Sequence, residues 1–270
     1  MTSMENLAQF VAAVGLVGAG VAFLTAFAAE LPIRFASRPA AKLAPLCLVV
    51  ALAALIVSLG SRGIQARRWP VGSLYEFTLL LSLFLVAAYI LLQRRTPQAQ
   101  LGATISILAL ALVVGASLTR PTSLDAKTLP PVMQGLWFPL HTLLLAIACG
   151  LLGLAASAAV LQLLAPQSQC TAAVDCSMDL GYVALSLGMI AGAVWGEMAW
   201  GSYWTWSTKE TWTLATWWAC TIYLHVRHRR AWRRSRALWI AALAFALALT
   251  TIYVTPSMAR LTRLIGPPTY

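Results

Sequence analysis

The densest group of chemistry-bearing side chains in this sequence is a run of tryptophans. Seven of the eleven tryptophans fall between Trp195 and Trp218. Within that run, the segment 200–206 places four large rings in seven positions. Ordinary packing does not demand this density, because each indole N–H needs a partner and each ring needs a large apolar surface. At the end of a membrane helix, the cluster predicts a platform for a large, flat, apolar ligand such as a porphyrin.

Histidine is the second residue type with relevant chemistry, since haem iron is commonly held by histidine. The chain has three: His141, His225 and His228. An ionisable residue inside a membrane span is by default a candidate functional residue. His141 lies about one turn into an apolar stretch, at the end predicted to carry the tryptophan run. It could meet a haem on the platform, and an interfacial histidine bonded to a carbonyl fits its position equally well.

His225 lies too far along the next predicted helix to share an iron with His141. About fifteen residues separate it from the tryptophan end of that helix, which is roughly 22 Å at 1.5 Å per residue. It follows Trp218 by seven residues, on the same helix face, and that face could hold a second haem inside the bilayer. Its position beside arginines is also typical of a histidine at the inner interface. His228 lies among those arginines and is expected to face water.

Haem propionates need cations, and three basic residues lie on the same predicted side as the platform. These are Lys209, Arg120 and Lys127. Lys209 could instead pair with the adjacent Glu210. A further acid, Glu76, enters the start of an apolar helix, where an unpaired charge is costly. It is therefore expected to face a partner group or water.

Composition predicts an all-α, polytopic membrane helix bundle. The 270 residues are 60% hydrophobic and only 10% charged, unlike a soluble domain of this size. Apolar stretches long enough to span a bilayer recur along the chain. No repeat or soluble domain interrupts them, so residues 1–270 are expected to form one integral membrane domain. The predicted spans are 8–29, 41–61, 72–93, 99–118, 137–164, 179–199, 210–226 and 236–256.

The basic residues predict the orientation. The segment 227–236 holds six arginines and no acid, and such segments stay in the cytoplasm. This places the N-terminus and the tryptophan-rich loop outside. With that topology, 11 of the 19 Lys and Arg lie on the inner side. The net charge of +11 is then explained by topology, with no nucleic acid as a partner; binding of a lipid headgroup or a partner is the remaining use for the arginines.

The five cysteines form neither a CxxC pair nor a CxxCH motif for covalent haem. Any haem handled by this chain is therefore expected to be held noncovalently. Haem b is the form that such a site would take.

These residues resemble a known family. The run A-W-G-S-Y-W-T-W-S-T-K-E-T-W at 199–212, followed by I-Y-L-H at 222–225, resembles the tryptophan-rich "WWD" signature of cytochrome c assembly proteins. The likeness is greatest to the CcsA (ResC) branch of system II, which typically reads A-W-G-S-Y-W-x-W-D-P-K-E-T-W. The segment 70–76 resembles the P-x-S-N-L-Y-E-S element of that branch, and Leu140-His141 resembles the start of the helix that carries its outer haem histidine.

The resemblance implies a haem-handling protein of the bacterial cytoplasmic membrane. Such proteins act with a CcsB (ResB) partner and present haem on the outer face to apocytochrome c, as one half of a synthase. By this resemblance, His141 matches the outer haem ligand and His225 the ligand of an inner, membrane-embedded haem. The platform would be formed by Trp200, Trp204 and Trp206.

The sequence also departs from the family pattern. Ser207 and Thr208 replace the Asp and Pro that follow the last platform tryptophan, although Ser can still cap the next helix. The second outer histidine of the family, in G-L-H-S-Y, has no counterpart after His228. Met258 is a candidate replacement ligand, and a plain interfacial methionine is the simpler interpretation. A five-coordinate haem, a ligand from a partner protein and a site without haem all stay open.

Two alternative functions therefore stay open beside haem presentation to apocytochrome c. A non-catalytic relative, serving as a structural or regulatory subunit of a membrane complex, would account for the two departures. A transporter that moves haem across the bilayer would need a polar path, and His225 is the main intramembrane polar group that favours it.

Overall fold

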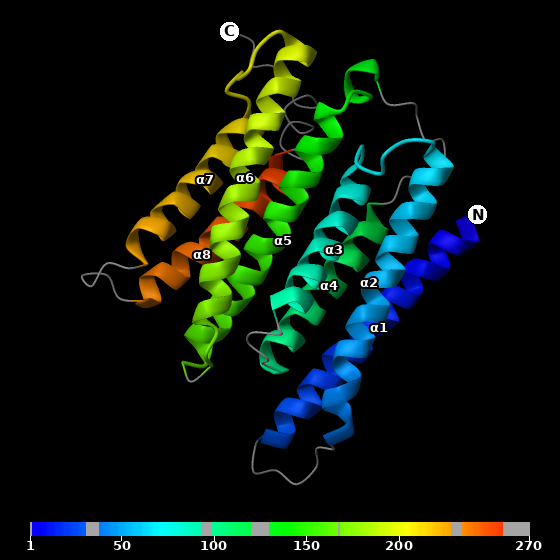
Figure 1. Cartoon of the computed structure of the whole chain (residues 1–270), viewed down its shortest axis with the longest axis vertical. Coiled ribbons are helices and arrows are strands. Elements are labelled where there is room, and N and C mark those ends of the chain that lie inside the picture. The colour runs from blue at the N-terminus through cyan, green and yellow to red at the C-terminus, as the bar shows by residue number, and fades with distance from the viewer. Residues whose placement is uncertain are drawn as a thin grey trace, which may run out of the picture.

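The computed structural model describes residues 2–30, 38–92, 99–119, 130–166, 168–227 and 234–255. Within these ranges every regular element is a helix (Figure 1). The helices are α1 (Thr2–Glu30), α2 (Arg38–Ala66), α3 (Leu74–Leu92), α4 (Ala99–Leu118), η1 (Pro131–Met133), α5 (Trp137–Leu164), α6 (Thr171–Trp200), α7 (Thr208–Val226), α8 (Arg234–Leu249) and η2 (Thr250–Val254). The predicted all-α membrane bundle is confirmed.

The eight predicted helices correspond to α1–α8 in order. The bounds predicted for α4 and α5 match, whereas α6 begins at Thr171 instead of 179. The prediction was wrong there because hydropathy detects only the apolar part of a helix. The first turns of α6 carry Asp175 and Asp179, which pair with arginines and extend the helix beyond its apolar stretch.

Seven helical stretches in the described part of the chain are long and apolar enough to cross a membrane. The protein is thus an integral membrane protein. Among the predicted spans, α7 is not apolar enough to be one of these seven stretches, because its first turns are polar and include Lys209, Glu210 and Thr213. The count of eight spans and an external N-terminus stay predictions.

The bundle is organised around α5, which packs against α6, α3 and α8. On one side α1 packs on α2 and α4, and on the other side α7 packs on α8 and α6 (Figure 1). Figure 1 also shows that the α2–α3 connection, η1 and the α6–α7 connection lie toward the same end of the bundle. We call this the tryptophan end. The opposite end, with Arg227 and Arg234, is the arginine end.

Small residues set the distances between the helices. A Cβ added to Gly150 of α5 would lie 2.8 Å from the backbone of Phe84 and Leu85 in α3. A Cβ on Gly15 of α1 would lie 3.1 Å from the carbonyl oxygen of Cys47 in α2. In a membrane, close contact of this kind drives helix association, because lipid tails are as apolar as the side chains they replace.

Glu76 lies fully buried at the tryptophan end, where it meets two arginines. Its Oε1 is 3.1 Å from Nε of Arg62 and 3.0 Å from Nη2 of Arg68, and its Oε2 accepts from the Gly72 backbone N–H at 2.7 Å. The expectation that Glu76 faces a partner group is confirmed. Removing one side of such a buried pair costs about 3–5 kcal/mol, so this cluster holds the α2–α3 connection in place.

A second buried contact ties α1 to α3. The Tyr75 hydroxyl donates to Glu5 at 2.6 Å and accepts from the Gln9 amide. Both Glu5 and Tyr75 are fully buried. Glu5 thus anchors the first helix to α3.

Asp175 and Asp179 of α6 join three helices at the arginine end. Asp175 lies 3.2 Å from Nη2 of Arg234 and accepts from the Tyr223 hydroxyl at 2.5 Å. Asp179 lies 2.8 Å from Nη1 of Arg227. Two arginines of the predicted cytoplasmic segment therefore make intramolecular ion pairs. The residues between them, 228–233 with His228, lie outside the described part of the chain.

We expect Gly150→Ala to destabilise the bundle by about 1–3 kcal/mol, since its Cβ would meet backbone atoms that cannot turn aside. The matched control is Gly60→Ala in α2, where a Cβ meets nothing within 4 Å; this variant should keep or slightly raise the melting temperature, because alanine favours helix. Thermal unfolding in detergent, followed by tryptophan fluorescence, measures both. A Gly150→Ala protein as stable as wild type would contradict this account of α3–α5 packing.

Candidate functional site

His141 is held in a defined orientation on the second turn of α5. Its Nδ1 lies 2.7 Å from the carbonyl oxygen of Gly188 in α6. A carbonyl can only accept a hydrogen bond, so Nδ1 carries the proton and the lone pair of the neutral ring lies on Nε2. Metal-binding histidines commonly have this arrangement, in which one ring nitrogen donates to a backbone carbonyl while the other ligates.

Glycines on α6 make room for the His141 ring. A Cβ added to Gly192 would lie 2.5 Å from Cε1 and Nδ1 of His141. Gly188 and Gly192 are four residues apart and thus share one helix face. The ring can reach the carbonyl of Gly188 because the next turn of α6 has no side chain in its way.

Trp195 lies between His141 and the tryptophan platform. Its ring is within 14° of parallel to the His141 ring, at 6.3 Å between centroids, and it meets Trp200 edge-on at 5.4 Å. Its indole N–H donates to the carbonyl of Val132 in η1 at 2.8 Å. Trp195 is not among the site residues predicted from the sequence. Its position in the sequence could have identified it, because it lies seven residues after Gly188 and therefore on the same face of α6, toward α5.

The platform begins where α6 ends. Gly201 closes α6 in the left-handed conformation at φ 70°, and its N–H donates to the Glu197 carbonyl. The chain then turns so that Trp200 and Trp206 are 61% and 70% exposed. Such exposure of two indoles, one on each side of Trp204, leaves their faces available to a ligand or to lipid.

In the sequence, Trp204 lies between Trp200 and Trp206, and its side chain is half buried. It meets Trp206 edge-on, with 5.9 Å between the ring centroids. Its indole nitrogen is buried, and no acceptor lies within reach among the described residues. Buried donors without a partner are rare in proteins, so this N–H is a candidate contact for an acceptor on a ligand.

Ser207 caps α7, as the sequence analysis allowed. Its side chain accepts from the backbone N–H of Glu210, and the Glu210 carboxylate accepts in return from the Ser207 N–H at 2.7 Å. Thr205 adds two more hydrogen bonds to that carboxylate. Ser207 therefore links the end of the loop to the first turn of α7.

Lys209 lies exposed beside this cap. Among the described residues no ion pair joins it to Glu210, whose carboxylate is occupied by Ser207 and Thr205. Arg62 and Arg68, at the same end of the bundle, are both bound to Glu76. The other predicted cations, Arg120 and Lys127, lie outside the described residues, as does Met258.

The structure does not bring His225 to His141. His225 lies at the arginine end of α7 and faces outward, exposed, with Nδ1 2.7 Å from the carbonyl of Thr221 on its own helix. Trp218 and Ile222, 54% and 44% exposed, continue the same outward face. The Nε2 of His225 is thus available to a group outside the bundle.

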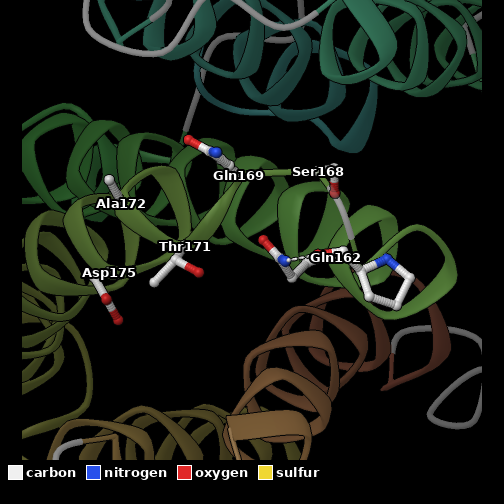
Figure 2. Close-up of a pocket in the computed structure, with 7 residues that line it drawn as sticks. Gln162, Ser168, Gln169, Thr171, Ala172 and Asp175 are labelled. Carbon is white, nitrogen blue, oxygen red and sulfur yellow. Dashed lines mark hydrogen bonds between the residues drawn. The ribbon is translucent and has the colours of Figure 1, made fainter.

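A hollow of about 500 Å³ lies at the arginine end, at the opposite end of the bundle from His141 (Figure 2). Its lining comprises Gln162, Pro166, Ser168, Gln169, Thr171, Ala172 and Asp175. These residues include no histidine and no aromatic ring. The hollow therefore lacks the ligands and flat apolar surface that a porphyrin needs, and the tryptophan end remains the candidate site.

Known proteins are similar to this chain over most of its length. The CcsA cytochrome c biogenesis protein of Guillardia theta is 28% identical over 232 residues, covering 74% of this chain and 77% of the relative. The protein of the same name from Synechococcus elongatus is 29% identical over 248 residues, covering 70% and 76% of the two chains.

Among solved structures, the cytochrome c haem lyase CcmF superposes with a TM-score of 0.76 at 16% identity. The match covers 93% of this chain but only 46% of that one, so the likeness is one of fold. Residues 71–261 match the family described as "Cytochrome C assembly protein". That range includes Glu76, His141, the tryptophan platform and His225, and the chain is a member of the cytochrome c assembly protein family.

Proposed function

We propose that this protein binds haem b noncovalently at the tryptophan end and presents it for attachment to apocytochrome c. The observation that carries the proposal is the state of His141: its Nδ1 is occupied by Gly188, and its Nε2 is left for iron. Exposed indoles at Trp200 and Trp206 offer apolar faces next to it. The named relatives act in cytochrome c biogenesis, which supports the same role here.

The residues present are suited to a porphyrin substrate. His141 would ligate the iron, and Trp200, Trp204 and Trp206 would lie against the macrocycle. Lys209 would neutralise a propionate. The unpartnered Trp204 N–H supplies a donor for a carboxylate oxygen of the ligand.

The protein's contribution is to hold the haem and to control access to it. In the attachment reaction, a cysteine thiol of the apocytochrome CxxCH motif adds across a haem vinyl group. The sulfur bonds to one vinyl carbon, and the thiol proton ends on the other. We assign none of the described residues to that step, and the proposal is that the chain acts as one half of a synthase with a CcsB (ResB)-type membrane partner.

His225 would serve a second haem, held inside the membrane on the outward face of α7. Its Nδ1 bond to Thr221 leaves Nε2 available, as in His141. Because His225 is exposed on the described bundle, a second ligand for that iron would come from outside it. A membrane partner seated against α7 meets this need.

The tryptophan end would face the outside of a bacterial cytoplasmic membrane. The support is the charge at the opposite end, where the arginine-rich segment begins at Arg227. A periplasmic or extracellular position is also where apocytochrome c would receive haem. Both the orientation and the partner remain part of the proposal.

The first test is haem binding by purified protein. We expect the wild type to bind haem, and His141→Ala to lose the histidine-ligated spectrum of the tryptophan-end haem. His225→Ala should retain it, because His225 lies at the other end of α7. Optical spectroscopy with added haem measures each variant. A wild type that takes up no haem would refute the proposal and favour a non-catalytic relative, and loss of haem in His225→Ala alone would place the ligand at the arginine end.

Gly192→Ala is a second probe of the same site, since its Cβ would displace the His141 ring. We expect this variant to weaken haem binding about 10–100-fold, as loss of an orienting contact does at metal sites. Gly115→Ala in α4, where a Cβ meets nothing within 4 Å, is the matched control. Equal affinities in the two alanine variants would show that His141 does not ligate this haem.

Orientation is tested with single cysteines in a chain whose five native cysteines are replaced. We expect a cysteine at the exposed Tyr203 to react with a membrane-impermeant maleimide added to intact bacterial cells. A cysteine at Gln169, at the arginine end, should react only after the membrane is permeabilised. The reverse pattern would invert the proposed topology.

A further inference from the structure

We propose that Trp195 is a positioning residue for His141, holding the imidazole plane so that Nε2 faces the haem iron. This inference rests on the proposed function, because the orientation of His141 matters only if its Nε2 binds haem iron. The contacts around Trp195 support it. Trp195 touches no ligand in this account. It acts through the ring of His141.

Three residues on one face of α6 control the His141 ring. Gly188, Gly192 and Trp195 follow each other at spacings of four and three, which places them on the same helix face. The carbonyl of Gly188 holds Nδ1, and the bare backbone at Gly192 leaves space for the ring edge. Trp195 stacks on the ring within 14° of parallel. A hydrogen bond at Nδ1 alone would let the ring swing about that contact, and the stacked indole opposes this rotation.

The Trp195 ring is itself fixed from three directions. Its N–H donates to Val132 at 2.8 Å, Phe138 packs against it at 5.2 Å, and Trp200 meets it edge-on at 5.4 Å. Aromatic pairs prefer the offset or edge-to-face arrangements seen here. The orientation of His141 is thereby linked to η1 on one side and to the first platform ring on the other.

The hydrogen bond from Trp195 to Val132 makes it possible to distinguish a positioning role from simple space filling. A phenylalanine would fill much of the same volume and would still stack on His141, but it has no N–H for the Val132 carbonyl. Trp195→Phe therefore removes the anchor and keeps the ring, whereas Trp195→Ala removes both. Trp239→Ala is the matched control, because Trp239 in α8 is 63% exposed and takes no part in the site.

The experiment uses the full-length protein labelled with ¹⁵N-histidine in detergent, first without haem. Only three histidines are present, and His141→Ala identifies the signals of His141. We expect wild type and Trp239→Ala to show one His141 tautomer, with the proton on Nδ1. Trp195→Ala should give averaged signals from both tautomers, and Trp195→Phe should lie between them.

Haem titration of the same four proteins supplies a second readout. We expect Trp195→Ala to bind haem about 10–100-fold more weakly than wild type. Trp195→Phe should show a smaller loss, with a changed spectrum of the histidine-ligated iron. Trp239→Ala should match wild type in both respects.

The outcomes separate this inference from the proposed function. If the His141 tautomer and the haem affinity are unchanged in both Trp195 variants, the positioning role is refuted. If Trp195→Ala does not fold, Trp195→Phe decides: signals and spectra equal to wild type refute the role, and altered ones support it. If wild type binds no haem but the tautomer shifts on substitution, Trp195 positions His141 and the proposed function is the part that fails.

Discussion

The close contact between α5 and α6 is the interaction on which the rest of this structure depends. Added Cβ atoms on α6 would lie 3.3 Å from Leu152 at Gly181, 2.9 Å from Leu145 at Gly188 and 2.5 Å from His141 at Gly192. Small residues at regular spacing let two membrane helices approach closely enough for dispersion forces to hold them. Because of this approach, a backbone carbonyl of α6 can reach the ring of His141.

Several features at the tryptophan end follow from that contact. The register of α6 against α5 places Trp195 on His141 and ends α6 at Trp200, where Gly201 turns the chain. The loop after Gly201 is short and closes in the capping box of α7. The platform is consequently held at both ends by helices, and its rings project from a constrained loop.

Ion pairs lie at both ends of the bundle, and the part between the ends is apolar. At the tryptophan end, Glu76 pairs with both Arg62 and Arg68, whereas Arg67 and Lys209 are exposed. At the arginine end, Asp175 and Asp179 take up Arg227 and Arg234. Unpaired charges inside a bilayer are costly, so both sets lie where helices end.

Much of the fold could be predicted because its signals are local. Apolar stretches of spanning length located α4 and α5 to the residue, and the Ser207 cap was recognisable from three neighbouring positions. The prediction was wrong at the start of α6, whose helix continues through polar turns that hydropathy does not detect. There the decisive contacts of Asp179 and Asp175 come from Arg227 and Arg234, which lie 48 and 59 residues further along the chain.

The sequence by itself determined the membrane class and the order of the eight long helices. It also determined that Glu76 needs a partner, since an isolated carboxylate is costly anywhere in lipid. Only the tertiary structure decided which partners are used: Arg62 and Arg68 for Glu76, Gly188 for His141, and Val132 for Trp195. The reason is that the type of a side chain shows which kind of hydrogen-bond or charge partner it needs. The helix register and the packing distances decide which atoms come within its reach.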